Sequence, residues 1–246
     1  MRIDCAVSLC ERGRFTYSWN RHRDYTAADL AMILSRNRFD GAFAIGQLDD
    51  PAETDWLLTL ATQEAWMIGV LTQVRDRRHW DNWQRHPKFF GVESPLIADV
   101  VELETRGLVS TLPPAEAALA LSAAPALRLV VRTMSGVSFL AAAEFDTWAR
   151  SLDVFKDSTA LMQIDGLLNS AGPGGWDAAA CRPWVRHVVD TFGAPRVAFG
   201  SGWPNCMPHC TWKESLACFT QSIGARTQED RGMILGENAV DFFSPA

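Results

Sequence analysis

The feature that most constrains this chain is an eightfold alternation of short apolar runs with longer amphipathic segments. Each run is too hydrophobic to have one face in water, and such strands are typical of a parallel sheet that helices cover on both sides. Eight strand–helix units in 246 residues is the count of a closed (β/α)8 barrel. The sequence therefore predicts an α/β fold of the TIM-barrel type, with strands at residues 3–9, 39–46, 65–72, 89–93, 107–111, 127–132, 159–165 and 196–201.

An open, doubly wound sheet is the alternative fold for the same alternation. In that fold a Gly-x-Gly-x-x-Gly turn often follows a strand and approaches a dinucleotide phosphate. No such turn follows any predicted strand here, and the chain has no internal repeat, low-complexity tract or linker. We therefore predict one barrel domain over residues 1–246.

Charge and composition argue against several classes of partner. The net charge is −6 and no block of Lys and Arg is present, which argues against nucleic acid and against an anionic membrane surface. No run approaches the roughly 18 apolar residues of a membrane span, and the first residues enter a predicted strand without a signal-peptide stretch. Six cysteines in such a chain indicate reduced thiols. We expect a cytoplasmic protein that binds a small-molecule ligand or substrate, or else pairs with a second copy or a partner subunit.

The segment at 196–206 stops abruptly after an apolar run. RVAF leads into GSG and then into Trp203-Pro204, through which neither a helix nor a strand continues easily. Such an end of a buried strand is typical of the rim of a site. Around it stand QIDGL at 163–167, FGAPR at 192–196 and ILGENAVDF at 234–242. Together these motifs resemble the amidohydrolase-2 family, a family of metal-dependent hydrolases and decarboxylases built on a (β/α)8 barrel.

The resemblance implies a catalytic frame, yet this chain lacks the residues that normally react in it. Family members have Gly-Ser-Asp-Trp-Pro after the last strand, and the aspartate binds metal or activates water; here that position is Gly202. Their first strand has two histidines where this chain has Ala6 and Ser8. The lysine of their seventh strand is Gln163, and the histidine after their sixth strand has no counterpart beside Arg132. Because a divalent ion needs three or more carboxylate or imidazole ligands, we expect no metal and no other cofactor.

The barrel fold indicates where any remaining chemistry would lie. In a (β/α)8 barrel the site forms at the C-terminal ends of the strands. Two carboxylates and one imidazole expected there provide an acid–base set, namely Glu93, Asp165 and His209. A competing interpretation is that Glu93 and Arg132 form a structural ion pair in the polar space where a metal would lie. The ligand-binding side chains expected around this set are Ser8, Arg132, Thr133, Ser201, Trp203 and Cys206.

A thiolate metal site is a further hypothesis. Cys10 shares the inward parity of residues 6 and 8, and Cys206, His209 and Cys210 follow the last strand. The alternative is that these cysteines pack as small hydrophobic side chains.

Two functions remain open from the sequence. The leading hypothesis is a metal-free, degenerate barrel, a pseudoenzyme that binds a small carboxylate-type ligand or a partner subunit. The opposing hypothesis is an active hydrolase or lyase, lactonase-like or decarboxylase-like, that uses the relocated set of Glu93, Asp165 and His209.

Overall fold

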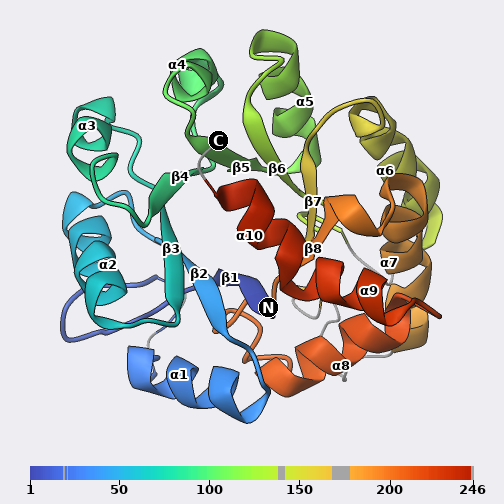
Figure 1. The fold of residues 1–246 in the computed structure, drawn as a ribbon, viewed down its shortest axis with the longest axis horizontal. Coiled ribbons are helices and arrows are strands. Elements are labelled where there is room, and N and C mark those ends of the chain that lie inside the picture. Colours follow the sequence, from blue (N-terminus) through green and yellow to red (C-terminus); the bar gives the residue numbers. More distant parts are fainter. Residues whose placement is uncertain (19, 21, 138–141, 168–177, 245–246) are drawn as a thin grey trace.

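The computed structural model describes residues 1–244 except 19, 21, 138–141 and 168–177. Within these residues an eight-stranded parallel sheet runs in the order β1 to β8, and each strand pairs with the next one along the chain (Figure 1). This order confirms the predicted (β/α)8 barrel. The strands are β1 (Ile3–Val7), β2 (Gly41–Ile45), β3 (Met67–Thr72), β4 (Phe89–Glu93), β5 (Val109–Leu112), β6 (Arg128–Arg132), β7 (Leu161–Ile164) and β8 (Val197–Phe199).

The barrel closes between β1 and the segment that follows β8. The Gly202 amide donates a hydrogen bond to the Ala6 carbonyl at 3.0 Å, and the Ser8 amide donates to the Trp203 carbonyl at 2.7 Å. The sequence predicts both strands to continue for two more residues at their C-terminal ends. β1 stops earlier because the chain after it pairs through isolated contacts of the closing seam. After β8 the Gly200 amide still donates to the Ile164 carbonyl, and the Ser201 amide donates to the Asp4 side chain instead of to a strand.

Helices surround the sheet, and local capping explains where several of them begin. Thr26 and Asp29 form a capping box at the start of α1, and Thr211 and Glu214 form another at α8. Asp50 caps α2, whose first residue is proline. The helices around the barrel are α1 (Ala27–Arg36), α2 (Pro51–Gln63), α3 (Trp80–Trp83), α4 (Val100–Thr105), α5 (Pro114–Ala123), α6 (Phe145–Leu152), α7 (Ala178–Phe192) and α8 (Trp212–Ser222).

Side-chain alternation along the strands divides the hydrophobic core in two. One set packs between the sheet and the helices, and the other fills the inside of the barrel. Successive residues of a strand point to opposite faces, so each strand contributes to both sets. The inner set includes Ile3, Cys5, Phe43, Ile45, Leu71, Val109, Val130, Leu161 and Ala198.

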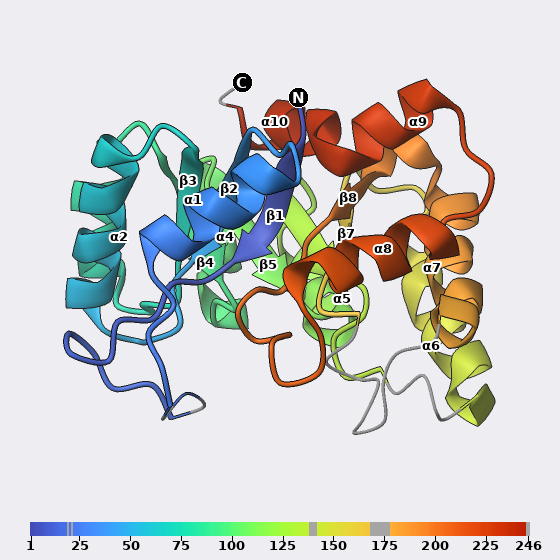
Figure 2. The ribbon, with the colours of Figure 1, turned by 90° about the horizontal axis from the view of Figure 1, so that it is seen from below.

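The C-terminal part of the chain covers the N-terminal end of the barrel (Figures 1 and 2). Phe243 is buried and stacks on Phe43 of the inner core, with ring centroids 4.3 Å apart. The Asn238 side chain donates to the carbonyls of Ala194 and Val197 at 2.7 and 2.8 Å. The opposite end is therefore the one left for a site. The covering elements are α9 (Gln228–Gly232), a π-helical turn (Met233–Glu237) and α10 (Asn238–Phe243).

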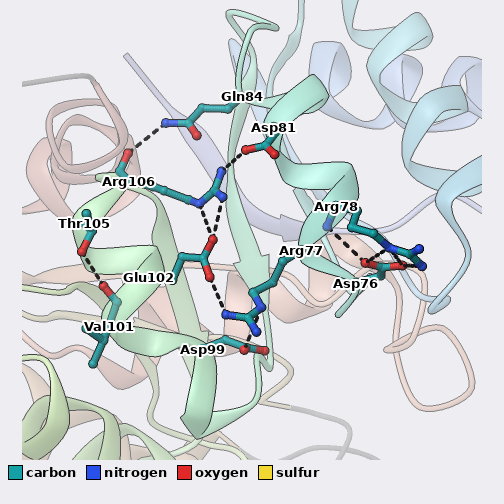
Figure 3. Close-up of polar contacts among 10 residues, drawn as sticks. All are labelled: Asp76, Arg77, Arg78, Asp81, Gln84, Asp99, Val101, Glu102, Thr105 and Arg106. Carbon is teal, nitrogen blue, oxygen red and sulfur yellow. Dashed lines mark hydrogen bonds and ion pairs between the residues drawn. The ribbon is translucent and has the colours of Figure 1, made fainter.

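A chain of ion pairs joins the α3 region to α4 on the outside of the barrel (Figure 3). The Arg106 guanidinium contacts Asp81 at 2.5 Å and Glu102 at 2.6 Å. Glu102 also pairs with Arg77 at 2.5 Å, and Arg77 continues to Asp99 at 3.4 Å. Two neighbouring strand–helix units are thereby linked through their side chains rather than through the sheet alone.

Candidate functional site

A small cavity opens at the C-terminal end of the barrel, with a volume of about 100 Å³. A larger groove of about 550 Å³ lies at the opposite end, where the segments that lead into β7 and β8 meet α9, the π-helical turn and α10. We place the candidate site in the smaller cavity because inward-facing charged groups from several strands converge there. Its lining consists of Ala6, Ser8, Ile45, Gln47, Gln73, Glu93, Arg132, Asp165, Gly202, Trp203 and Asn205.

The centre of the cavity is the guanidinium of Arg132, which lies between two carboxylates. It forms an ion pair with Glu93, and its other terminal nitrogen is 3.5 Å from Asp165. The Thr111 hydroxyl donates a second hydrogen bond to Glu93. Strand alternation explains part of the convergence, because Thr111, Arg132 and Asp165 share the inward face of their strands with Val109, Val130 and Leu161 of the inner core.

Burial and charge act in opposite directions on this cluster. Glu93 is only 2% exposed, and its burial raises the pKa of the carboxyl, while Arg132 and the Thr111 hydroxyl oppose the rise. The charges of Asp165 and Glu93 raise the pKa of Arg132 above its ordinary value. Arg132 therefore stays protonated and holds the two carboxylates together.

Gln163 lies on the same inward face of β7, one inward position before Asp165. Its side chain is 1% exposed, and neither its amide nitrogen nor its amide oxygen has a hydrogen-bond partner in the described part of the chain. A buried amide without partners is costly. Gln163 thus leaves an unused donor and an unused acceptor inside the barrel beneath the charged cluster.

Neutral side chains form the rim of the cavity. The Asn205 side-chain nitrogen donates to the Gln47 side-chain oxygen at 3.3 Å, which joins the segments after β8 and β2. The buried Glu53 carboxylate fixes the second of these segments, because one of its oxygens accepts from the amides of Gln47 and Leu48 at 2.8 Å each. Glu53 is therefore a positioning residue for the rim.

Asp4 anchors the segment after β8 from the outer side of the barrel. Its carboxylate accepts from the Ser201 amide at 2.8 Å, the Trp212 indole nitrogen at 2.7 Å and the Ala6 amide at 3.2 Å. The side chain is completely buried, and burial raises the pKa of Asp4 to about 6 despite these donors. Strand β1, the closing segment and α8 thus meet at one carboxylate.

The structure brings together five of the nine side chains predicted for the site. They line the cavity as Ser8, Glu93, Arg132, Asp165 and Trp203. The Glu93–Arg132 ion pair, predicted as the competing structural interpretation, is present. The roles of these five residues remain predictions.

The other four predicted residues lie outside the lining. Thr133 and Ser201 each follow an inward residue by one position and so face away from the cavity. The Thr133 hydroxyl donates to the Gln163 carbonyl at 2.9 Å, and the Ser201 hydroxyl accepts from the Trp203 amide at 3.0 Å. Cys206 is buried beyond the rim, and His209 is exposed.

Three polar lining residues were not predicted, namely Gln47, Gln73 and Asn205. A signal was present for the first two. Each lies two residues beyond an inward residue of its strand, Ile45 or Leu71, so the alternation that identifies the inner core also points to them. Asn205 follows the turn at Trp203-Pro204, where strand alternation no longer applies.

Comparison with known proteins decides the family. A sequence profile of the amidohydrolase family matches residues 109–244, more than half of the chain. The chain belongs to the amidohydrolase family. The predicted resemblance is thereby confirmed, and the match extends well beyond the motifs from which it was inferred.

Individual relatives of this amidohydrolase-family chain differ in what they act on or bind. The L-fucono-1,5-lactonase of Burkholderia ambifaria is 25% identical over 210 residues, which cover 74% of this chain and 71% of the lactonase. A zinc-bound amidohydrolase from Burkholderia multivorans has a TM-score of 0.83 and 20% identity, with 99% of both chains covered. A probable 2-pyrone-4,6-dicarboxylic acid hydrolase from Acinetobacter baumannii, with citric acid bound, has a TM-score of 0.78 and 14% identity, with 98% of both chains covered. At these identities the two structures establish a shared fold.

The mouth of this amidohydrolase-family barrel does not fit a divalent metal ion. Its two inward carboxylates are already paired with Arg132. The inward positions of β1 and of the segment after β8 hold Ala6 and Gly202, which offer no ligand atom on their side chains. Across the described ranges, no three His, Cys, Asp or Glu side chains gather in a way that could hold a metal.

The hypothetical thiolate site is not formed either. The Cys206 and Cys210 thiols hydrogen-bond to each other, and this bond together with burial raises the pKa of Cys206. The Cys10 sulfur instead accepts from the Asn20 side chain at 3.0 Å. With His209 exposed, the four predicted ligands do not converge, and the buried cysteines pack as small hydrophobic side chains.

In the part of the chain that the structure describes, none of the helices combines the length and the apolar character needed to cross a bilayer.

Proposed function

We propose that this amidohydrolase-family chain is a metal-free barrel that binds a small polar molecule at its mouth and carries out no metal-dependent hydrolysis. The observation that supports this proposal is the place of Arg132, between the carboxylates of Glu93 and Asp165. A guanidinium is always charged and offers a planar fork of donors to carboxylates. It supplies permanently the positive charge that a bound cation would bring, without a position for activating water.

We propose one barrel domain in a cytoplasmic protein, with a small molecule as the principal partner. Contact with a second copy or with a partner subunit stays an additional proposal.

The proposal is tested by elemental analysis of the purified protein, followed by addition of zinc and manganese. Hydrolysis of L-fucono-1,5-lactone, the substrate that names a relative, is assayed before and after the addition. We expect less than stoichiometric metal, no thermal shift on addition and no metal-dependent turnover. Stoichiometric metal together with metal-dependent turnover would overturn the proposal.

A second candidate function is that of a metal-independent hydrolase or lyase in which Glu93 and Asp165 act as acid and base. The observation in its favour is that burial raises the pKa of Glu93, since catalytic acids are carboxyls kept protonated by their surroundings. His209, predicted as the third member of this set, does not line the cavity. Turnover of the lactone by chelator-treated protein, abolished by Glu93→Gln, would favour this candidate over the first.

A further inference from the structure

The charges at the mouth bear on the chemical class of the ligand, and the inference that follows rests on the proposed function. Among the residues that line the cavity, the charged ones are Glu93, Asp165 and Arg132. Two carboxylates face one guanidinium, so the ionised cluster carries one negative charge in excess. Each terminal nitrogen of Arg132 already faces a carboxylate. A ligand carboxylate would therefore meet a cation that is already neutralised and a surplus of like charge.

The hydrogen-bonding groups at the mouth also favour one kind of ligand. The side-chain oxygen of Asn205 is buried and has no hydrogen-bond partner within the described residues, while its nitrogen is used by Gln47. Asp165 has its one described ion-pair contact at the long distance of 3.5 Å, which leaves acceptor capacity on its carboxylate. The buried Gln163 amide beneath the cluster has an unused donor and an unused acceptor and lies outside the lining. Among the residues that line the cavity, the Asn205 oxygen and the Asp165 carboxylate can accept from a ligand, whereas the unpartnered Nε of Arg132 belongs to a guanidinium whose terminal nitrogens already face carboxylates. Two such acceptors favour a ligand that donates, and an ammonium group has three donors and no acceptor.

Size and surroundings agree with a small ligand of this kind. The cavity of about 100 Å³ equals the space of about three liquid water molecules, so only a few heavy atoms fit. Trp203 forms part of the wall. Ser8 and Gln73 supply neutral polar groups for the uncharged end of the ligand.

We propose that the mouth of this barrel binds a small primary ammonium compound, with the ammonium group received by Asp165 and the side-chain oxygen of Asn205. This differs from the carboxylate-type ligand expected from the sequence. The fold disfavours a carboxylate because it places both Glu93 and Asp165 on the guanidinium of Arg132.

The test uses three small molecules of similar shape and different charge: ethanolamine, ethylene glycol and glycolate. Binding to the full-length protein is followed by ligand-observed NMR titration at about pH 8, where carboxylates are ionised and the amine is still largely protonated, at constant ionic strength. We expect ethanolamine to bind at least about tenfold more tightly than the other two, since opposite charges attract strongly in a partly buried site. Glycolate or ethylene glycol binding as tightly as ethanolamine would overturn the ammonium proposal and leave the binding site itself in place.

Two variants identify the receiving groups. Asp165→Asn removes the excess negative charge and should weaken ethanolamine binding by about tenfold or more, with little effect on ethylene glycol. Asn205→Ala keeps the charge and removes one acceptor, so a smaller loss is expected, and it serves if Asp165→Asn does not fold. Unchanged ethanolamine affinity in a folded variant of Asp165 would overturn the assignment. If none of the three compounds binds, the ammonium proposal fails, while metal content and lactone turnover still judge the proposed function separately.

Discussion

At the scale of single residues, the mouth of the barrel depends on a carboxylate that does not face it. Asp4 accepts hydrogen bonds from Ser201, Trp212 and Ala6 and so fixes the closing segment against β1 and α8. Burial disfavours the charged form of a carboxyl, and the pKa of Asp4 is raised to about 6. The group that holds the rim in place is thus ionised at neutral pH at a cost to stability.

This cost predicts a definite pH dependence. Protonated Asp4 stabilises the folded chain relative to ionised Asp4. This stabilising contribution to the free energy of unfolding is fully present below the ordinary pKa of 3.8 and is lost as the pH rises through about 6. The gap between the two values corresponds to about 3 kcal/mol at most. We expect the free energy of unfolding of the native chain, relative to Asp4→Asn, to fall by up to that amount between about pH 4 and about pH 7.5.

Urea unfolding at a series of pH values measures this difference. The exposed Asp241 on α10 supplies the matched control, since Asp241→Asn should leave the pH profile of the native chain unchanged. Parallel profiles for the native chain and Asp4→Asn would show that Asp4 does not titrate in this range.

The residues of the site also show how far sequence alone reaches. Glu93, Arg132 and Asp165 were predicted because they stand where apolar strands end, and the fold brings all three to one cavity. The direction of Thr133 was missed because adjacent residues of a strand face opposite sides. His209 was predicted to face the cavity, but it lies beyond a turn that breaks the alternation, and its side chain is exposed.

At the scale of elements, the short helices α3 and α4 need support from outside the sheet. Together they contain few turns, and short helices are marginal without tertiary contacts. The ion pairs through Arg106 and Glu102 provide such contacts (Figure 3). Exposed ion pairs contribute little alone and more when several charges form a network with good geometry.

Arg106→Ala tests this contribution. We expect it to lower the free energy of unfolding by about 0.5–1 kcal/mol at low salt, because Arg106 joins two acidic partners and its side chain is 21% exposed. The effect should shrink near 1 M salt, where charges are screened over about 3 Å. The control is Arg78→Ala, which removes an ion pair with Asp76 whose arginine side chain is 88% exposed, and no measurable change is expected. An Arg106 effect that is independent of salt would point to packing instead.

The location of each strand was predicted better than the residues at which it begins and ends. The apolar runs located all eight strands because parallel strands buried on both faces are continuous in hydrophobicity. The C-terminal ends of β1 and β8 were placed too late, since Ser8 pairs with Trp203 in the closing seam and Gly202 crosses to Ala6 soon after β8 ends. A pairing between residues almost 200 positions apart leaves no local signal in the sequence.

At the scale of the whole molecule, one end of the barrel holds the candidate binding site and the other end is packed for stability. The mouth holds charged and amide side chains around a cavity. The opposite end is covered by α10, whose Phe243 inserts against Phe43 and contacts Phe90 edge to face. The close fit there is shown by Gly236, where an added Cβ would lie 2.5 Å from the Ile3 amide nitrogen. Stability and binding are therefore expected to respond to different substitutions.

Phe243→Ala tests this separation. Phe243 is 1% exposed, and truncation of a buried phenylalanine leaves a cavity and costs about 3–5 kcal/mol. We expect a loss of that size in urea unfolding. Phe243→Leu should cost clearly less because it fills most of the volume, and so should Phe242→Ala, since Phe242 is only partly buried beneath the Arg128 guanidinium.

Ligand titration of the same variants shows whether packing at one end of the barrel affects binding at the other. Any variant that remains folded should bind ethanolamine at the mouth with the affinity of the native chain, because Phe243 and Asp165 belong to opposite ends of the barrel. If Phe243→Leu weakens binding several-fold while staying folded, packing of α10 is coupled to the mouth through the inner core, and the separation of tasks is wrong. If Phe243→Ala costs less than about 1 kcal/mol, far below the usual cost of such a cavity, α10 is not a structural cover of the barrel.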